Sequence, residues 1–271
     1  MKVHAVQTGL VRIRRRQVEP VASGIRRRLD TLRDRTWSDW LPIHAWLIEH
    51  PSGPIVVDTG ETARVAEPGY LPRWHPWYRF GVGFRVAPEE EIGPQLERLG
   101  FEPAAVLTVV LTHLHLDHAD GLPHFPDARV LVSAAERRAA SGLRGRLDGY
   151  LPDHWPSSVR MEALDLAPDA TGAFRAAAPV AEGVRAVATP GHTPGHVSVV
   201  VDGDPPILIA GDVTYRLDLL MDGRIDGVAP DDAQAHESVV RVRAFVQSTG
   251  AVCLPTHDPG SAGRLATAQM T

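Results

Sequence analysis

The sequence is poor in cysteine and lysine, and it lacks long apolar runs. Cys253 is the only cysteine, so an internal disulfide is excluded and any bound metal must be held by nitrogen and oxygen. Because Cys253 lies in an apolar stretch, we expect it to pack in the core. No apolar run approaches the roughly 20 residues of a membrane-spanning helix, and the amino terminus has no long apolar region with a cleavage site. We therefore expect a cytoplasmic protein that does not contact membranes.

Negative charge prevails overall, but one segment is strongly basic. The formal net charge is -5, which argues against nucleic acid as the general partner. Residues 12–35, however, include nine arginines and only three acidic residues. Since Lys2 is the only lysine, arginine is the habitual cation of this chain. We interpret residues 12–35 as a solvent-exposed face or a subunit contact, and a nucleic-acid-binding arm is the alternative.

The most informative stretch is Val-Val-Leu-Thr-His-Leu-His-Leu-Asp-His at positions 109–118. If the backbone stays extended, alternation places His113, His115 and Asp117 on one side. His118 then requires a turn, which the Ala-Asp-Gly sequence after it allows. Three imidazoles and a carboxylate are more donors than one tetrahedral ion takes from so short a loop. The stretch therefore predicts a pair of metal ions. Histidines without a ligand role are the alternative.

Three further donors follow short aliphatic runs elsewhere in the chain. His192, Asp212 and His257 come after residues 184–188, 207–210 and 251–254, just as the first cluster follows residues 106–111. Each run reads as a strand, and sites of sheet proteins gather at the carboxyl ends of strands. We expect four strands to deliver ligands to one site.

Other segments carry ordinary secondary-structure signals. We expect strands at 3–13 and 128–132, a hairpin of 43–48 with 54–57, a helical turn near 25–32, and helices at 88–99, 134–140 and 231–250.

These motifs together resemble the metallo-β-lactamase superfamily, and within it the N-acyl-homoserine lactonases. The resemblance rests on Asp58-Thr59-Gly60, the 113–118 cluster, Gly-His-Thr-Pro-Gly-His at 191–196, Gly211-Asp212 with Tyr215, and Thr-His-Asp at 256–258. It implies an α/β protein with a four-layer αβ/βα sandwich, formed by residues 1–271 as a single domain. Tyr215, three positions beyond Asp212, and the segment before the cluster point to lactonases.

The resemblance also implies which ion each donor binds. It assigns His113, His115 and His192 to one ion, Asp117, His118 and His257 to the other, and Asp212 to both. A carboxylate has two oxygens for two cations, whereas an imidazole serves one. We expect two divalent ions, zinc first, although iron, manganese and cobalt also accept these donors.

Two further residues have supporting roles in this interpretation. His196 has no ligand place in the family pattern, so we expect it to be structural. The resemblance implies that Asp58 supports the metal loop from behind, and an Asx-turn that ends a strand is the alternative.

The implied reaction is hydrolysis of a lactone ester by a hydroxide that bridges the two ions. Tyr215 is expected to donate to the developing oxyanion, and Asp117 is a candidate for passing a proton to the leaving alkoxide. The alternative for Tyr215 is that its ring only packs beside the site.

An aromatic-rich insertion at about 61–88 is the expected contact for the acyl tail. The expected substrate-binding residues are Trp74, Trp77, Tyr78, Phe80 and Tyr215. Aromatic side chains on a loop supply apolar area at little entropic cost. A hydrophobic lid over the core is the alternative. The resemblance further implies a homodimer.

Other activities found in the superfamily would require sequence features outside the metal ligands. Thioesterases of the superfamily add a helical region after the last ligand, and only fourteen residues follow His257 here. Phosphodiesterases or nucleases need a basic surface, for which residues 12–35 are the sole candidate. Another carboxylic ester hydrolase and a metal-binding module without activity complete the alternatives.

Overall fold

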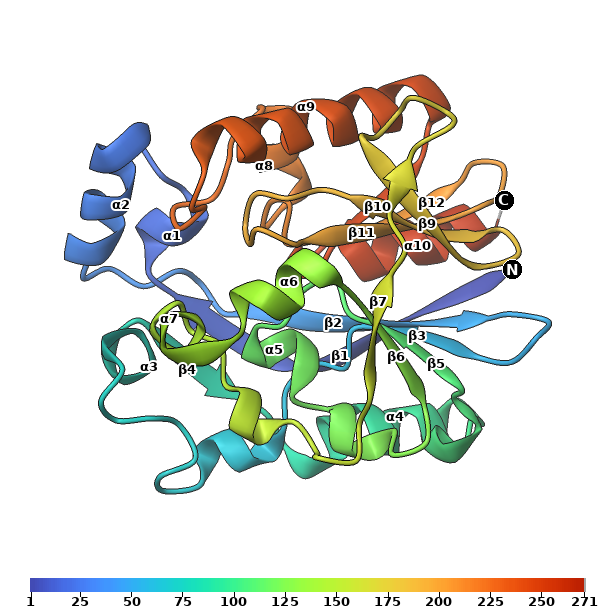
Figure 1. The fold of residues 1–271 in the computed structure, drawn as a ribbon, viewed down its shortest axis with the longest axis horizontal. Helices are drawn as coiled ribbons and strands as arrows, with labels where there is room; N and C mark the ends of the chain where they lie inside the picture. The colour runs from blue at the N-terminus through green and yellow to red at the C-terminus, as the bar shows by residue number, and fades with distance from the viewer. Residues whose placement is uncertain (271) are drawn as a thin grey trace. The chain divides into compact units, whose positions relative to one another are not determined.

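The structure is a computed structural model, and it describes residues 1–270. The chain forms two compact units. The amino-terminal unit comprises residues 2–12 and 40–163, and the carboxyl-terminal unit comprises Met1, residues 13–39 and the chain from 164 onward. Each unit is built on its own β-sheet (Figure 1).

The amino-terminal unit contains a seven-stranded mixed sheet in the order β4-β1-β2-β3-β5-β6-β7. β1, β2 and β3 pair antiparallel, whereas β3, β5 and β6 pair parallel. The register of β1 shifts between Gln7 and Leu10, where Gly9 has a φ of 116°. The strands are β1 (Lys2–Ile13), β2 (Leu41–Glu49), β3 (Ile55–Val57), β4 (Val82–Arg85), β5 (Thr108–Val110), β6 (Arg129–Ser133) and β7 (Met161–Leu164).

Short helices complete this unit. Ile92 and Leu96 of α4 are buried against sheet residues such as Val56 and Val109, because apolar residues four positions apart share one face of a helix. The α-helices are α3 (Pro76–Phe80), α4 (Ile92–Arg98), α5 (Leu116–Ala119), α6 (Ala134–Ala139) and α7 (Gly142–Leu147). The 3₁₀ helices are η1 (Ala63–Ala66), η2 (Pro88–Glu90), η3 (Pro103–Ala105), η4 (Leu122–His124) and η5 (Pro152–His154).

The carboxyl-terminal unit contains a six-stranded sheet in the order β13-β12-β11-β10-β9-β8. Its β11 is buried along its whole length, as expected for an interior strand made of valine and serine. β12 and β13 pair parallel, so their carboxyl ends meet at one edge. The strands are β8 (Ala167–Pro168), β9 (Ala176–Ala181), β10 (Val184–Ala188), β11 (Val197–Val201), β12 (Ile207–Gly211) and β13 (Val252–Pro255).

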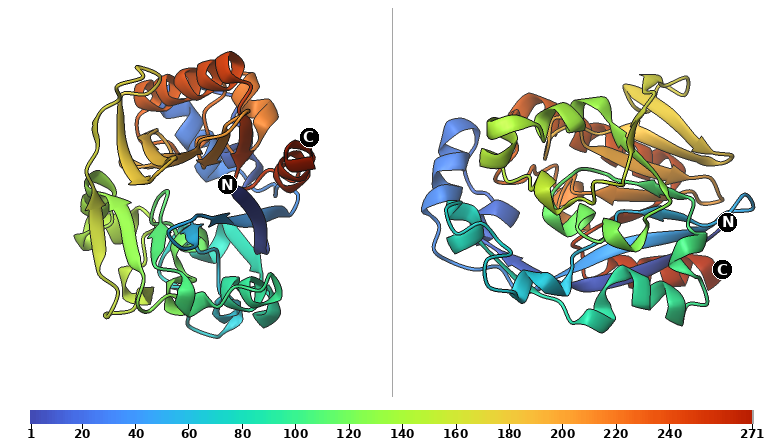
Figure 2. Two further views of the ribbon diagram at one scale, coloured as in Figure 1. Left: turned by 90° about the vertical axis from the view of Figure 1, so that its right-hand side faces the viewer. Right: turned by 60° about the horizontal axis from the view of Figure 1, so that its bottom comes forward.

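The long helix α9 (Asp232–Thr249) covers one face of this sheet (Figures 1 and 2). Asp231 caps its first turn by accepting from the N–H groups of Ala233 and Gln234, and Gly250 ends it in a left-handed conformation. The other helices are α1 (Arg15–Val18), α2 (Gly24–Arg33), α8 (Leu217–Met221) and α10 (Ser261–Met270). Among residues 1–270, no helix combines the length and the apolar character needed to cross a bilayer.

The structure confirms most of the expected elements and corrects three. The run before the ligand cluster does not stay extended, because β5 ends at Val110 and α5 begins at Leu116. The helix expected over 88–99 is split at Glu91, whose ψ of 155° is not helical. The aromatic stretch contains a helix, α3, which begins at Pro76, where the fixed φ of proline suits a first turn. The single domain with an insertion at about 61–88 stays a prediction.

Candidate metal centre

The first group of candidate ligands lies in the amino-terminal unit, with His113 and His115 on the loop between β5 and α5 and Asp117 and His118 in α5 itself. His113 and His118 are fully buried, and His115 and Asp117 are half-buried. The buried side chains of Leu111 and Leu114 anchor the loop in the core. Glu136, at the start of α6, accepts the backbone N–H of Leu114 at 3.1 Å. The loop is thus held by packing and by a hydrogen bond, which gives its histidines defined positions.

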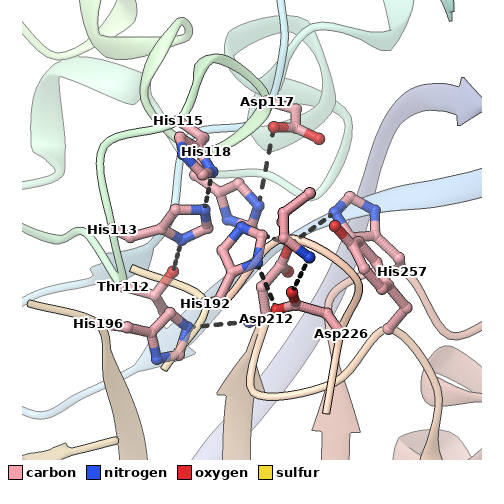
Figure 3. Close-up of polar contacts among 12 residues, drawn as sticks. Thr112, His113, His115, Asp117, His118, His192, His196, Asp212, Asp226 and His257 are labelled. Carbon is pink, nitrogen blue, oxygen red and sulfur yellow. Dashed lines mark hydrogen bonds and ion pairs between the residues drawn. The ribbon is translucent and has the colours of Figure 1, made fainter. Parts of the chain in front are cut away.

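The donor atoms of this group lie close together. The Nε2 of His113 is 3.0 Å from the Nδ1 of His115, and the Oδ1 of Asp117 is 3.9 Å from the Nε2 of His118 (Figure 3). The donor atoms of His113 and His118 lie within 4.8 Å of each other. Ligands at about 2.0–2.2 Å from an ion are separated by distances of this order.

Asp58 supports this loop from behind, as the resemblance implies. Its Oδ2 lies 2.9 Å from the Nδ1 of His118, and its Oδ1 accepts the backbone N–H of Thr112 at 2.8 Å. A carboxylate on Nδ1 fixes the imidazole ring and directs Nε2 to the metal, which is the usual arrangement around metal-bound histidines. Asp58 has a φ of 58°, a left-handed conformation that aspartate tolerates.

The second group of candidate ligands comes from three places in the carboxyl-terminal unit. His192 follows β10, Asp212 follows β12 and His257 follows β13, as the sequence predicts. All three side chains are buried. The Oδ2 of Asp212 lies 3.3 Å from the Nε2 of His257 and 3.7 Å from the Nε2 of His192 (Figure 3). The carboxylate is therefore near both imidazoles.

His196 has the structural role expected of it. Its Nε2 accepts the backbone N–H of Asp212 at 2.9 Å, and its Nδ1 lies 2.9 Å from the hydroxyl of Thr189. Because both ring nitrogens are engaged with the protein, His196 acts by holding the backbone of Asp212.

Asp226 is a supporting residue that the sequence analysis missed. Its Oδ2 lies 2.8 Å from the Nδ1 of His192, and its Oδ1 accepts the backbone N–H groups of Val228 and Ala229. Asp226 thus does for His192 what Asp58 does for His118. No signal in the sequence marks it, because it belongs to no ligand motif and is 34 positions from His192.

Tyr215 lies beside two of these ligands. The centroid of its ring is 6.0 Å from that of His192 and 5.5 Å from that of His257. Its side chain is buried, and its hydroxyl accepts a hydrogen bond of 2.9 Å from the amide of Gln17. Gln17 is a second residue that sequence reasoning missed.

The donor chemistry of both groups fits divalent metal ions. His118 and His192 each have Nδ1 against a buried carboxylate, which leaves Nε2 as the ligand atom. Imidazole and carboxylate donors suit zinc, iron, manganese and cobalt. The one cysteine is not a candidate ligand, because Cys253 is buried in β13 and burial raises the pKa of its thiol to about 12.

A buried acidic pair lies behind the amino-terminal ligand loop. Burial raises the pKa of Glu61 well above its usual range, and the neighbouring carboxylate of Asp120 raises this pKa further. The hydroxyl of Tyr70 donates to Asp120 at 2.6 Å, and the Nδ1 of His154 lies 3.2 Å from the other oxygen of Asp120.

The four aromatic residues expected to bind the acyl tail differ in exposure. The side chains of Trp74 and Phe80 are 57% and 56% exposed, Trp77 is half-buried, and Tyr78 is buried with its hydroxyl donating to the carbonyl of Gly149. A cavity of about 430 Å³ in this unit is lined by ten residues. They are Gly69, Tyr70, Leu71, Pro72, Arg73, Trp74, Arg146, Leu151, Asp153 and His154. Of the four aromatics, Trp74 is the one that lines this cavity.

Fold and donor set together define a metallo-hydrolase class. Residues 38–257 match the profile of the metallo-beta-lactamase superfamily, and the chain belongs to that family. The α/β class and the metallo-β-lactamase type of fold expected from the sequence are thereby confirmed.

The curated and structural relatives are more specific. The chain is 30% identical over 234 residues to the N-acyl homoserine lactonase AttM of Azorhizobium caulinodans. The aligned region covers 81% of this chain and 82% of that protein. Among solved structures the chain resembles an N-acyl homoserine lactone hydrolase with the product N-hexanoyl-L-homoserine bound at its catalytic metal centre. That match has a TM-score of 0.74 and 21% identity, and it covers 97% of this chain and 95% of the other.

A further similar structure is AidC, a dizinc quorum-quenching lactonase in complex with a homoserine product. The TM-score is 0.65 at 16% identity, with 95% of this chain and 87% of the other covered. At these identities the structural likeness shows the fold. The comparison of activity therefore rests on the curated relatives, not on the solved structures.

Proposed function

We propose that this chain is a dinuclear metal-dependent hydrolase that opens the ester ring of lactones, with N-acyl-homoserine lactones as the expected substrates. The observation that carries the proposal is the ligand chemistry of both units, in which buried histidines are backed by the carboxylates of Asp58 and Asp226. The similarity to curated N-acyl homoserine lactonases supports the choice of substrate.

The proposed centre combines the ligands of both units. One ion is assigned to His113, His115 and His192, the other to Asp117, His118 and His257, and Asp212 to both. The nearness of Asp212 to the Nε2 atoms of His192 and His257 supports its shared role. We propose zinc as the metal, because a similar fold is that of a dizinc lactonase and the donors suit zinc.

Two bound divalent ions would supply Lewis acidity and lower the pKa of the water that acts as nucleophile. Tyr215 is proposed to donate its hydroxyl hydrogen to the oxyanion that develops on the lactone carbonyl, since its ring lies beside His192 and His257. Asp117 is proposed to pass a proton to the leaving alkoxide. Its half-buried carboxylate lies at the start of α5, with Oδ1 3.9 Å from the Nε2 of His118.

The acyl tail is assigned to the aromatic segment. Trp74 has the strongest support, because it is exposed and lines a cavity. Trp77, Tyr78 and Phe80 complete the proposed set, and Tyr78 contributes by shaping the segment rather than by an exposed surface.

We also propose a homodimer in the cytoplasm that does not bind nucleic acid. Ile25, Leu29 and Leu32 are exposed at helical spacing on α2, which suits a subunit contact. A single, buried cysteine suits a reducing compartment. Light scattering of the purified chain measures the oligomeric state directly.

A hydrolysis panel on one metal-replete preparation tests the proposed function. The panel contains acyl-homoserine lactones, plain γ- and δ-lactones, a thioester and a phosphodiester. We expect turnover of lactones, with acyl-homoserine lactones preferred. Hydrolysis of the thioester or phosphodiester, with every lactone left intact, would replace the proposed substrate class.

A further inference from the structure

The basic segment, which lies in sequence between the two parts of the amino-terminal unit, contains buried polar side chains, among them those of Arg27 and Gln17. Most arginines of residues 12–35 reach the surface, but Arg27 on α2 is 1% exposed. Gln17 on α1 is 4% exposed. Burying an arginine or a glutamine is costly unless its polar atoms are satisfied, so the contacts of these two residues indicate what the segment does.

Arg27 binds the loop that contains Asp226. Its guanidinium donates to the carbonyl of Asp226, to the carbonyl of Ala229 at 2.8 Å, and to the carboxylate of Asp232 at 2.7 Å. The fork of a guanidinium suits several acceptors at fixed directions. Arg27 therefore holds α2 against the loop whose Asp226 supports His192.

The same loop is joined to α1 through Gly227. The N–H of Gly227 donates to the carbonyl of Gln17 at 2.7 Å, and its own carbonyl accepts from the hydroxyl of Thr31 at 3.2 Å. A Cβ at Gly227 would lie 2.3 Å from the carbonyl oxygen of Arg16, so this close approach requires glycine. The backbone of Gln17 is thus fixed relative to the loop at 226–229.

The side chain of Gln17 reaches Tyr215 from this fixed backbone. Its amide nitrogen donates to the phenol oxygen at 2.9 Å, with both groups buried. A phenol has a single hydrogen and rotates about its C–O bond. When its oxygen accepts from one fixed direction, the direction in which it donates is restricted.

We propose that Gln17 is a positioning residue for Tyr215, and that residues 13–39 are the element that carries it. This inference rests on the proposed function, in which Tyr215 is the oxyanion donor. Gln17 does not touch the substrate; it orients the phenol and, by donating to its oxygen, makes the phenolic hydrogen a stronger donor. The segment that looked like a basic surface is then a part of the site.

Replacing Gln17 by methionine tests the proposal. Gln17→Met keeps the length of the side chain and removes the amide donor. We expect kcat toward lactones to fall about threefold to tenfold, as for the loss of one neutral hydrogen bond, while KM and metal content stay close to wild type. The matched control is Gln247→Met on the exposed face of α9, which is expected to leave kcat unchanged.

A double-mutant cycle separates positioning from general destabilisation. In the Tyr215→Phe background, Gln17→Met should cause no further loss, because the group it positions is absent. Gln17→Glu is the second variant. Its carboxylate would accept from the phenol instead of donating to it, so we expect a larger fall in kcat than with Gln17→Met. Equal losses from Gln17→Met in both backgrounds would overturn the proposal.

A measurement without turnover distinguishes this inference from the proposed function. In protein labelled with ¹³C at the hydroxyl-bearing carbon of tyrosine, Tyr215→Phe identifies the resonance of Tyr215. Gln17→Met should shift that resonance and leave those of the other three tyrosines in place. An unshifted resonance in a folded variant refutes the role of Gln17 even if the enzyme is an active lactonase. A shift without any lactonase activity refutes the proposed function instead.

Discussion

Four candidate ligands of the amino-terminal unit lie within six consecutive positions after β5, whereas the three of the carboxyl-terminal unit follow three separate strands. The first of these ligand groups is supported by Asp58, which directly follows the neighbouring strand β3, and β3 pairs with β5. The carboxyl-terminal ligands depend on Asp226, on His196 and on the distant segment that contains Arg27.

This difference shows two ways of fixing a histidine. In the first, local chain geometry does most of the work, because strand pairing already brings Asp58 beside the loop. In the second, long-range hydrogen bonds replace local geometry: Asp226 is held by its own turn and by α2. The second arrangement has more parts, so it offers more places where substitution should weaken metal binding without touching a ligand.

The largest effect is expected at Asp212, which serves both ions in the proposed centre. Asp212→Ala removes the shared carboxylate, and we expect kcat/KM toward lactones to fall at least about a thousandfold, together with loss of metal. Kinetics and elemental analysis on the same preparation measure both. Asp222→Ala, at the exposed end of α8, is the matched control and should behave as wild type. Substantial activity in Asp212→Ala would contradict the shared role.

Substitution of the two supporting carboxylates compares the local support of His118 with the long-range support of His192. Asp58→Asn and Asp226→Asn keep the size of the side chain, but each puts an N–H group where an oxygen accepted a hydrogen bond. We expect each to weaken metal affinity about 10–100-fold, measured by competition with a chelator. Asp222→Asn is the control.

The pattern of the two variants is also predicted. Asp58→Asn should lower the affinity for the ion assigned to His118. Asp226→Asn should lower the affinity for the ion assigned to His192. If Asp226→Asn has wild-type affinity for both ions, the long-range support of the carboxyl-terminal ligands is not functional.

Tyr215 tests whether the carboxyl-terminal unit also contributes chemistry. Tyr215→Phe keeps the ring and removes the hydroxyl. We expect kcat to fall about 10- to 100-fold with metal content unchanged, which is less than the full loss of an oxyanion donor because a bound ion would also stabilise that oxyanion. KM should rise by a smaller factor. Wild-type rates toward every lactone would remove Tyr215 from the mechanism.

The smallest effects are expected at the aromatic segment of the amino-terminal unit. Trp74→Ala should raise KM about tenfold for long-chain lactones and little for short ones, since about 25 cal/mol is lost per Å² of apolar contact. Trp77→Ala should have a weaker effect, because Trp77 does not line the cavity that Trp74 lines. Leu143→Ala, an exposed residue of α7, is the control. The same rise in KM at every chain length would mark the segment as a structural lid.

The sequence predicts the strands and the ligand types better than it predicts their supports. Short aliphatic runs followed by histidine or aspartate correctly placed β5, β10, β12 and β13, because buried strands need continuous apolar residues. The alternation that an extended backbone would give through Asp117 does not occur, since β5 ends at Val110 and α5 starts at Leu116.

Asp226 and Gln17 were not predictable from local patterns. Each acts on a residue far along the chain, and only the folded arrangement of α1, α2 and the loop at 226–229 brings them to His192 and Tyr215. Asp58 was predictable because a known motif contains it. Its contact with His118 follows from the pairing of adjacent strands.

The metal content of the purified chain tests the central proposal most directly. The seven donors of the two units are proposed to form one dinuclear centre, so elemental analysis of protein loaded with zinc and freed of excess metal should give about two ions per chain. Asp212→Ala should hold fewer. A wild-type stoichiometry that saturates at one ion per chain, with Asp212 intact, would contradict the dinuclear centre and the mechanism built on it.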